Sequence, residues 1–475
     1  MRYIVTPEEM RGVEQAAFQR GVSSLLLMET AARRAFERLC ALLPRGGRVV
    51  FLCGPGNNGG DGLAMARMWR MAGNEAAVAL PQTPRTPDAQ TNYRYASALG
   101  IPVTPGIGGR ADAVVDALFG TGFRGAVDPE SDMGRLIAAA NGMGCPILSV
   151  DIPSGMDGLT GAAAGACVRA DETVTFHAVK RGLVFAARPE LAGEITVADI
   201  GLAQTVGIPW ADELSELLPP RALTAHKGDC GRVAIFAGSE GMAGAAVMAA
   251  KACLRAGSGL VTVICPREII PILQKTVPNA MCRAAEEQPD IPCGARLLGC
   301  GLAETAETWR ELMRLHDENT PEVWDAGALN LLAKQPMKLG RNACVTPHLG
   351  EAARLLGQDV ADIAADPIAA ARALSGLYGC GVALKSAVTV MCDAEGNLAV
   401  NAVRAPALAK GGSGDALAGI LASLLGQGLR GLRAMQAACL WHGLAGKIAG
   451  ERCGVRAALT GDVIDCLGEA ERMSC

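Results

Sequence analysis

The sequence predicts an α/β protein of two domains, the first built around a parallel, doubly wound sheet. Its 475 residues exceed the length of one ordinary domain. From about residue 48, a short apolar run, a glycine-rich turn and a segment with helical spacing recur in that order, which is typical of strands connected by helices. There are 59 glycines but only 4% aromatic residues, a balance expected of α/β proteins with many tight turns between strands and helices.

The first half, about residues 1–213, begins with a helix. Residues 6–9, Thr-Pro-Glu-Glu, form an N-cap, a proline at the first helical position and an acidic first turn. Met10, Val13 and Ala17 are expected to face inward. A second helix is expected over residues 62–71. The predicted buried strands are residues 48–53, 76–80, 113–119, 146–150 and 172–176.

The second half, about residues 220–475, follows a connector with the sequence Leu-Leu-Pro-Pro-Arg at residues 217–221. A new series of apolar runs then begins, and glycine or proline ends nearly all of them. No short-period repeat is present. The predicted strands are residues 232–236, 260–264, 295–298, 343–346, 382–385 and 389–392.

Composition limits the partners and the compartment. Lys and Arg number 44 against 48 Asp and Glu, a net charge of −4 with no polybasic run, which argues against nucleic acid and anionic membranes. The 17 cysteines are scattered, and the closest pair, Cys293 and Cys300, has no Cys-x-x-Cys spacing, which argues against a disulfide scaffold and a zinc site. The N-terminus lacks an apolar signal region, so we expect a cytoplasmic protein.

The strongest feature of the first half is Gly-Pro-Gly-Asn-Asn-Gly-Gly-Asp-Gly at residues 54–62, between a predicted strand and a predicted helix. Glycines there let backbone N–H groups approach an anion, and a helix start adds partial positive charge. The segment predicts a dinucleotide phosphate site, although its spacing is not the usual G-x-G-x-x-G. The alternative is a glycine turn without a ligand. Asn57, Asn58 and Asp61 argue against it, because their side chains can bind polar groups or a cation.

Residues 116–125, 150–155 and 176–180 also follow predicted strands. They should meet at the same edge of the sheet, where α/β sheets bind ligands. Asp116 or Asp151 alone would suit a helix cap or a turn, the commoner fates of Asp at a strand end. Together the segments would gather carboxylate, amide and hydroxyl oxygens around one crevice. Such hard ligands of low total charge suit a monovalent or weakly held cation.

These motifs closely resemble the NAD(P)H-hydrate epimerase domain, over nearly all of residues 1–213 and including Leu-Met-Glu at residues 27–29. The resemblance implies a Rossmann-like, three-layer doubly wound domain with potassium as cofactor, and Asp151 and Lys180 as candidates for moving protons. The implied potassium ligands are Asn58, Asp116 and Ser154. The implied hydrate-binding residues are Asn57, Asn58, Gly59, Gly60, Asp61, Gly120, Thr121, Gly122, Phe123, Arg124, Gly125, Ala126 and Asp151.

The strongest feature of the second half is Lys-Gly-Gly-Ser-Gly-Asp-Ala-Leu at residues 410–417, which opens an apolar helical segment running to Leu425. Consecutive N–H groups at a helix start form an anion hole, and Asp415 can take a proton from a substrate hydroxyl, as phosphoryl transfer requires. The alternative is a plain N-cap with Asp415 near the positive end of the helix dipole, but such a cap needs only Ser or Asp. No Walker A lysine motif is present, which argues against a P-loop enzyme.

Other strand ends support this site. His348 lies in Thr-Pro-His-Leu-Gly-Glu-Ala at residues 346–352, better placed to contact a ligand than His316, which is expected to be solvated in a polar helical stretch. A lone histidine is usually structural, so that alternative stays open for His348. Residues 385–389 form another strand-end turn that would face a nucleotide phosphate or adenine.

Residues 224–475 resemble the ribokinase-like fold and, within it, the ADP-dependent NAD(P)H-hydrate dehydratase. The resemblance implies ADP as co-substrate and Mg²⁺ as cofactor. The implied hydrate contacts are Ala245, Gly301, His348 and Asp415. The implied adenine-nucleotide site is Lys385, Ser386, Ala387, Val388, Thr389 and Gly414.

Two motifs depart from that family. Its Gly-Pro-Gly-Leu-Gly reads Gly-Cys-Gly-Leu-Ala at residues 299–303, which introduces Cys300 and Ala303. Its Lys-Gly-x-x-Thr reads Lys-Ser-Ala-Val-Thr at residues 385–389, which introduces Ser386. Because glycine adopts backbone angles that other residues resist, Ser386 and Ala303 are expected to alter or weaken the nucleotide fit.

Together the resemblances imply a bifunctional repair enzyme for NADH hydrate and NADPH hydrate. The domain of residues 1–213 would interconvert the R and S hydrates. The domain of residues 220–475 would dehydrate the S form with ADP, giving NAD(P)H, AMP and phosphate. The alternative is a C-terminal small-molecule kinase of the ribokinase-like fold joined to a non-catalytic nucleotide-binding module. The family association also implies a homo-oligomer.

Overall fold

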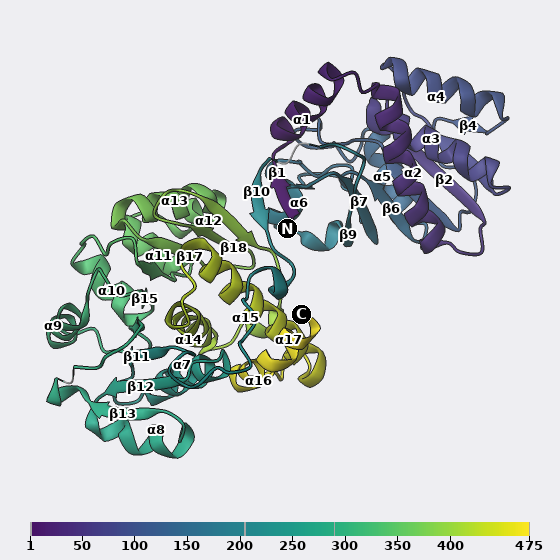
Figure 1. The fold of residues 1–475 in the computed structure, drawn as a ribbon. Coiled ribbons are helices and arrows are strands. Elements are labelled where there is room, and N and C mark those ends of the chain that lie inside the picture. The colour runs from purple at the N-terminus through teal and green to yellow at the C-terminus, as the bar shows by residue number, and fades with distance from the viewer. Residues whose placement is uncertain (1, 204–205, 289, 475) are drawn as a thin grey trace. The chain divides into compact units, whose positions relative to one another are not determined.

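Two separate, mainly parallel sheets organise the chain in the computed structural model, which describes residues 2–203, 206–288 and 290–474 (Figure 1). One compact unit spans Arg2–Ile208, and the other begins at Pro209. Each unit contains its own sheet with helices packed on it, so the predicted α/β fold class is confirmed for both halves.

The first unit has a seven-stranded sheet in the order β4-β3-β2-β5-β6-β7-β9, in which every pairing is parallel. A short parallel pair, β1 with β8, lies outside this sheet. The elements in order are β1 (Arg2–Val5), α1 (Pro7–Gln19), α2 (Ser24–Leu42), β2 (Arg48–Cys53), α3 (Asn57–Met71), β3 (Glu75–Ala79), α4 (Pro87–Ala98), β4 (Val103–Thr104), β5 (Ala113–Ala117), α5 (Asp132–Asn141), β6 (Ile147–Val150), β7 (Glu172–Phe176), β8 (Val179–Lys180), α6 (Arg181–Phe185) and β9 (Glu194–Ala198).

Alternating residues of β2 bury opposite faces of this sheet, as the period of a strand requires. Val49 and Phe51 belong to a core with apolar residues of α2 and α3. Val50 and Leu52 belong to a second core with residues of α5. Helices therefore cover both faces, and the predicted three-layer, doubly wound arrangement is confirmed.

The first helix begins as the sequence predicts. The Thr6 hydroxyl accepts a hydrogen bond from the backbone N–H of Glu9, and the Glu9 carboxylate accepts one from the backbone N–H of Thr6, which completes a capping box. Met10 and Val13 are buried, while Ala17 is only half-buried.

Helix α3 begins at Asn57, five residues before the predicted start at Gly62. The Asn-Asn-Gly-Gly-Asp sequence has low helix propensity, but tertiary packing overrides it. A Cβ on Gly59 would lie 1.8 Å from the carbonyl oxygen of Gly54, and one on Gly60 would lie 2.7 Å from Met28. These glycines therefore let the first turn of α3 lie directly against the preceding turn and α2.

The second unit has a nine-stranded sheet in the order β13-β12-β11-β14-β15-β16-β17-β18-β19, parallel as far as β17 and antiparallel beyond it. The elements are β11 (Arg232–Phe236), α7 (Ala243–Arg255), β12 (Leu260–Cys265), α8 (Ile270–Thr276), β13 (Met281–Ala284), β14 (Ala295–Leu298), α9 (Ala306–Leu315), β15 (Glu322–Trp324), α10 (Gly327–Lys334), β16 (Ala343–Val345), α11 (Leu349–Leu356), α12 (Val360–Ala365), α13 (Pro367–Tyr378), β17 (Gly381–Leu384), β18 (Thr389–Cys392), β19 (Leu398–Asn401), α14 (Ser413–Gly426), α15 (Gly431–Cys453), α16 (Thr460–Asp465) and α17 (Leu467–Met473), after β10 (Ile208–Trp210) at the boundary.

One face of this sheet is covered by α7, α14 and α15, whose buried residues share a core with Val233 and Ile235 of β11. The long apolar helix predicted to end at Leu425 is α14, which ends at Gly426. The opposite face is buried too, since Phe236 and Trp324 are almost fully covered. Strands β13, β15 and β19, each of three or four residues, were not predicted.

His316 is not solvated as expected. It follows α9, and its Nδ1 lies 2.7 Å from the carboxylate of Glu322, which is fully buried at the start of β15. The same carboxylate accepts hydrogen bonds from the Trp324 indole at 2.9 Å and the Asp317 backbone N–H at 2.8 Å. The polar appearance of this stretch reflects donors gathered around a buried acid.

Within the described part of the chain, no helix is both long and apolar enough to cross a membrane. The cysteines in this described part of the chain are free thiols. Most are buried, as expected for cysteine used as a small apolar side chain.

Candidate active sites

The first site is a cavity of about 730 Å³ in the first unit, at the carboxyl edge of the seven-stranded sheet. The turns after β2, β5 and β6 meet there, as the sequence predicts. The predicted hydrate-binding residues that line it are Asn57, Asn58, Asp61, Gly120, Thr121, Gly122, Phe123 and Asp151. The others, which do not line it, are Gly59, Gly60, Arg124, Gly125 and Ala126.

The loop after β5 is fixed by a hydrogen bond to Asp151 and by contacts between its own residues. The backbone N–H of Thr121 donates to the Asp151 carboxylate at 3.2 Å. The Phe119 and Phe123 rings stack with centroids 5.0 Å apart. Arg124 turns back to donate to the carbonyl oxygen of Thr121 at 2.9 Å, and it thereby braces the loop.

Asp151 and Lys180 form a buried ion pair in this cavity. The Lys180 ammonium lies 2.7 Å from the Asp151 carboxylate and donates a second hydrogen bond to the Phe176 carbonyl oxygen at 2.8 Å. The Lys180 side chain is only 1% exposed. Asp151 has a φ of +71°, a left-handed conformation that is uncommon for a residue other than glycine and that costs free energy. The sheet thus fixes the direction of this carboxylate.

Asn58 and Asp61 present polar groups to the cavity from the first turns of α3. The Asn58 side-chain nitrogen is buried without a hydrogen-bond partner among the residues that the structure describes. Asp61 is 9% exposed, and burial raises the pKa of its carboxyl well above the usual value, with a further rise from the negative charge of Asp151. A buried amide without a partner and a buried carboxyl are groups that a bound polar ligand can satisfy.

The predicted potassium ligands supply oxygen atoms of three kinds. Asp116 is fully buried, and its carboxylate accepts hydrogen bonds from the Ser149 hydroxyl at 2.8 Å, the Ser154 hydroxyl at 2.5 Å and the Ser154 backbone N–H at 2.8 Å. Burial raises the pKa of Asp116. Asp116 and Ser154 are fully buried and do not line the cavity, whereas Asn58 does. The carboxylate, hydroxyl and amide oxygens of these three residues are ligands of low total charge, the type that suits a monovalent cation.

Helix α1 adds side chains that the sequence analysis did not assign. Met10, Glu14 and Phe18 line the cavity at helical spacing of four residues. The signal was present, because Glu14 lies on the same helical stripe as the inward-facing Met10.

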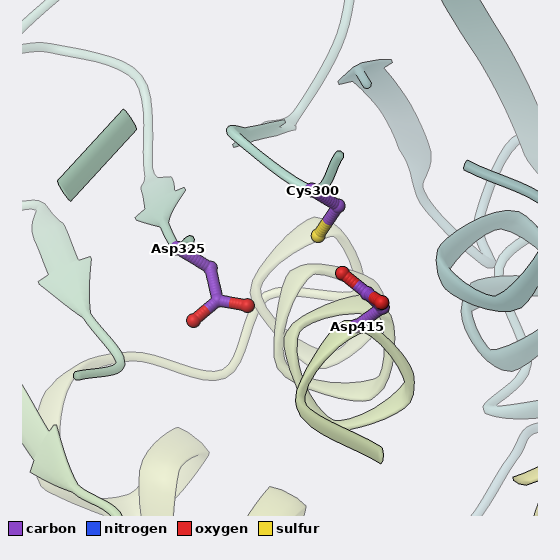
Figure 2. Close-up of side chains that lie close together, drawn as sticks. All are labelled: Cys300, Asp325 and Asp415. Atoms are coloured by element: carbon purple, nitrogen blue, oxygen red, sulfur yellow. The ribbon is translucent and has the colours of Figure 1, made fainter. Parts of the chain in front are cut away.

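The second site lies at the carboxyl edge of the nine-stranded sheet, where side chains from three segments converge (Figure 2). Cys300 follows β14, Asp325 follows β15 and Asp415 lies in the first turn of α14. Figure 2 shows the Cys300 thiol and the two carboxylates directed toward one another. Their ligand atoms all lie within 4.8 Å of one another.

Lys385, at the end of β17, supplies the positive charge of this cluster. Its ammonium lies 2.8 Å from the Asp325 carboxylate, which also accepts a hydrogen bond from the Thr346 hydroxyl at 2.8 Å. Gly414 packs beside it, since a Cβ on Gly414 would lie 3.1 Å from the ammonium nitrogen. The turn at Gly414 is therefore close enough to Lys385 for one bound anion to contact both.

Asp415 has the properties of a general base. Burial, followed by the negative charge of Asp325, raises its pKa to about 6, while the Cys300 hydrogen bond and the Lys385 charge oppose the rise. The pKa of the Cys300 thiol is raised well above its usual value by burial, so the thiol stays protonated and donates to Asp415. A carboxylate with a pKa near 6 is ionised at neutral pH and accepts a proton readily.

The start of α14 forms an anion-binding turn. Gly412 is the N-cap with a φ of +89°, which favours glycine, and no side chain caps the helix. The N–H groups of the first turn have no partner within a helix, and the helix dipole adds partial positive charge. A phosphate bound there would lie beside the Asp415 carboxylate.

The other predicted residues occupy different environments. His348 caps α11, and its Nδ1 accepts hydrogen bonds from the backbone N–H groups of Gly350 and Glu351, while its side chain is 56% exposed. The Nδ1 atom of His348 therefore has a structural role as a helix cap, while the rest of the ring is open to solvent. Gly301 lies against Ala245, since a Cβ on Gly301 would lie 2.7 Å from the Cβ of Ala245.

The predicted nucleotide turn is divided between exposed and buried residues. Ser386 and Ala387 are exposed, while Val388 and Thr389 are buried at the start of β18. The Ser386 hydroxyl donates to the Val388 carbonyl oxygen at 2.6 Å, so the residue that replaces the family's glycine closes the turn on itself.

Two residues of this site escaped the sequence analysis. Asp325 follows a strand of only three residues, so no strand signal pointed to it. His442 lies inside α15 with its Nε2 3.4 Å from the Ser413 hydroxyl, and burial, helped by the Lys385 charge, lowers its pKa to about 4. A buried histidine within an apolar helix gives no sequence signal distinct from that of a core residue.

Comparison with known proteins identifies both halves. A family model described as NAD(P)H-hydrate dehydratase matches residues 233–467, and one described as YjeF-related protein N-terminus matches residues 24–182. The ADP/ATP-dependent NAD(P)H-hydrate dehydratase of Bacillus subtilis, solved with ATP and Mg²⁺, is 26% identical with a TM-score of 0.53, over 57% of this chain and all of that one. A ribokinase-like superfamily protein of Enterococcus faecalis is 26% identical with a TM-score of 0.51, over 55% and 94%. The ribokinase-like expectation is therefore confirmed.

Full-length relatives carry one name. The bifunctional NAD(P)H-hydrate repair enzyme of Escherichia coli is 36% identical, with 96% of this chain and 91% of the relative covered. The enzyme of the same name from Coxiella burnetii is 35% identical, with 98% of each covered. This identity extends over both sites, and the chain belongs to the family of bifunctional NAD(P)H-hydrate repair enzymes.

Proposed function

We propose that this chain repairs NADH hydrate and NADPH hydrate in two steps. The first unit epimerises the R and S hydrates, and the second dehydrates the S form with ADP, giving NAD(P)H, AMP and phosphate. The observation that carries the proposal is the joint presence of two sites with different chemistry: a cavity with the Asp151–Lys180 pair, and Asp415 beside an anion-binding turn. We place the limits of the two activities at residues 1–213 and 220–475.

In the dehydratase site, Asp415 takes the proton of the hydrate hydroxyl while that oxygen attacks the terminal phosphorus of ADP, and the bond from this phosphorus to the bridging oxygen breaks to release AMP. The N–H groups at the start of α14 and the Lys385 ammonium hold the phosphate oxygens. Phosphate then departs with its bonding electrons, and the neighbouring carbon loses a proton as the double bond forms again. The phosphorylation is useful because phosphate is a far better leaving group than hydroxide.

The nucleotide would occupy the turn that contains Lys385, Ser386, Ala387, Val388, Thr389 and, from α14, Gly414. The hydrate would contact Ala245, Gly301, His348 and Asp415. Mg²⁺ usually binds through substrate phosphates and one or two carboxylates. Here the Lys385 ammonium already pairs with Asp325, and the Cys300 thiol is protonated. We therefore assign Mg²⁺ to the nucleotide phosphates, whose charge it neutralises, rather than to the side-chain cluster.

In the epimerase cavity, the hydrate would contact residues 57–61 and 120–126, with Asp151 and Lys180 placed to manage protons. Asn58, Asp116 and Ser154 would hold K⁺, which supplies a fixed positive charge near the ligand. The test is the epimerisation rate in KCl compared with an equal concentration of LiCl. We expect a higher rate in KCl for the natural chain and no difference for Asn58→Ala.

The central experiment follows the absorbance of NADH at 340 nm when the full chain is added to a mixture of R and S hydrate with ADP, ATP or no nucleotide. We expect complete recovery of NADH with ADP. Recovery that stops at the S fraction contradicts the epimerase assignment. Asp415→Asn should abolish nucleotide-dependent recovery and leave R-to-S exchange unchanged, and unchanged recovery contradicts the role of Asp415.

A small-molecule kinase remains the second candidate for the C-terminal half, because Cys300, Ala303 and Ser386 depart from the dehydratase pattern. A kinase leaves a stable phosphorylated product, whereas repair releases inorganic phosphate. Phosphate release in step with the 340 nm signal therefore separates the two. Light scattering of the purified chain tests the predicted homo-oligomer, and cell fractionation tests the cytoplasmic location.

A further inference from the structure

Glu14 is a cavity-lining carboxyl group without an assigned role. It lies on α1, one turn after Met10 and one turn before Phe18, and all three line the cavity. Among the described residues, no side chain or backbone group forms a hydrogen bond or ion pair with its carboxylate. Glu14 is half-buried, so part of the residue is in contact with solvent.

Four acidic residues, Glu14, Asp61, Asp88 and Asp151, line this cavity together with one ammonium group, that of Lys180. Asp151 is paired with the Lys180 ammonium at 2.7 Å. Asp61 is nine-tenths buried, has no hydrogen-bond or ion-pair partner within residues 2–203, 206–288 and 290–474, and faces the same space. Glu14 comes from a different element from either of them. The ammonium group that lines the cavity is therefore paired with Asp151, and the half-buried Glu14 and the buried Asp61 have no cation in contact among the described residues.

Glu14 and Asp151 lie in different surroundings. Burial, and then the negative charge of Asp151, raise the pKa of Glu14, while the positive charges of Lys180 and Arg11 oppose the rise. Asp151 instead has the Lys180 ammonium in direct contact at 2.7 Å. Two carboxyl groups in such different surroundings are the usual arrangement of an acid and a base.

Epimerisation of the hydrate requires both an acid and a base. Hydration of an enamine double bond places the hydroxyl on the carbon bonded to nitrogen, so loss of that hydroxyl leaves an iminium ion stabilised by the nitrogen lone pair. Hydroxide is a poor leaving group, so an acid must protonate it. When water adds back to the other face, a base must take up its proton.

We propose that Glu14 is the proton donor of the epimerisation, with Asp151 as the base, and this role rests on the function proposed above. Glu14 gives its proton to the hydroxyl as the carbon–oxygen bond breaks and the carbon–nitrogen double bond forms. A water molecule then adds to the opposite face, its proton passes to Asp151, and the nitrogen regains its lone pair. No electron is gained or lost, and the reverse reaction uses the two carboxyl groups in exchanged roles.

Solvent contact distinguishes Glu14 from Asp61 as the donor. After each conversion the donor must regain a proton, and Glu14 is exposed enough to exchange with water. Asp61, in the first turns of α3, is only 9% exposed. The charged groups near Glu14 are Arg11 on its own helix, and Asp61, Asp151 and Lys180 from the elements that face it.

The test compares Glu14→Gln with the natural chain in conversion of R to S NADH hydrate, measured by chromatographic separation of the epimers. We expect kcat to fall by at least about 10²-fold, the usual contribution of a general acid, with little change in KM. Glu14→Asp should retain part of the activity. The natural rate should fall as the pH rises through the raised pKa of Glu14, and Glu14→Gln should lose this dependence.

The matched control is Glu8→Gln, an exposed acid on the same helix that does not line the cavity. Urea unfolding of the first unit in each variant checks that the cavity is folded, because dehydration of S hydrate reports only on the second unit. A smaller loss in Glu14→Gln, or an unchanged pH dependence, overturns the role of Glu14. Absence of epimerisation in the natural chain instead contradicts the proposed function, so the two failures are distinguishable.

Discussion

Replacement of Cys300 by alanine should raise the pKa of the dehydratase base. Cys300 is fully buried, and its thiol donates a hydrogen bond to the Asp415 carboxylate, which stabilises the ionised form. Alanine removes the donor and leaves the Lys385 and Asp325 charges in place. The ionised form of Asp415 then loses stabilisation, while the protonated form is little affected.

The magnitude follows from the weakness of a thiol donor. An S–H···O hydrogen bond contributes about 0.5–1 kcal/mol, and one pKa unit corresponds to about 1.36 kcal/mol, so the pKa should rise by about 0.4–0.7 units. Starting from a pKa of about 6, the ionised fraction of Asp415 at pH 6 falls from about a half to about 0.2–0.3. Dehydration at pH 6 should therefore be about two- to threefold slower, with little change at pH 8.

The assay is the pH profile of kcat/KM for dehydration of S hydrate with ADP. Cys344→Ala is the matched control, because it removes a buried thiol from the same sheet at a position away from Asp415. Cys300→Ser keeps a hydrogen-bond donor to Asp415, so it should not raise the apparent pKa of the acidic limb of the kcat/KM profile. If the profiles of Cys300→Ala and the natural chain superimpose, the thiol does not tune Asp415 and the reasoning is wrong.

Three further predictions concern stability. Lys180→Met leaves the buried Asp151 carboxylate without its cation, so the free energy of unfolding of the first unit, measured in urea, should fall by about 3–5 kcal/mol. Adding Asp151→Asn should restore most of this loss. An unchanged free energy of unfolding in Lys180→Met would contradict the importance of the ion pair. The hydrogen bond to Glu322 raises the pKa of His316 above 6.5 in the folded protein. Protonated His316 therefore stabilises the fold fully below the pKa of the unfolded state, and this stabilisation is lost as the pH rises through the pKa of the folded state. The free energy of unfolding should fall over that pH range, and an equal fall in His316→Gln would show that His316 is not the cause. Gly59→Ala places a methyl group 1.8 Å from the carbonyl oxygen of Gly54 and should destabilise the first unit by about 1–3 kcal/mol. The measurement is the Tm of the first unit, and an unchanged Tm would show that α3 shifts to accommodate the methyl group.

Strands with continuous apolar runs were predictable from the sequence. Residues 48–53, 172–176, 232–236, 295–298 and 389–392 form strands with the predicted limits. The start of α3 was not predictable, because Asn-Asn-Gly-Gly-Asp resembles a loop and only its packing against the preceding turn makes it helical. Local propensity describes the chain before tertiary contacts form, so it fails where such contacts decide.

The sites show the same division. Asp415 and the Asp151 strand end stand in short motifs, so the sequence indicated them directly. Asp325 and Glu14 are single acids in stretches without a motif, and only the fold shows that they face Lys385 and the cavity. His316 was misjudged because its partner, Glu322, is buried, which composition cannot reveal.

Each site is assembled entirely within one of the two units, the first from residues before Pro209 and the second from residues after it. Covalent linkage therefore fixes a ratio: every polypeptide carries one centre that supplies S hydrate and one that consumes it. Changes in expression alter both capacities together, so the balance between them depends only on the turnover numbers. A mutation that slows one centre cannot be offset by making more of that centre alone, because each added chain brings the other centre with it.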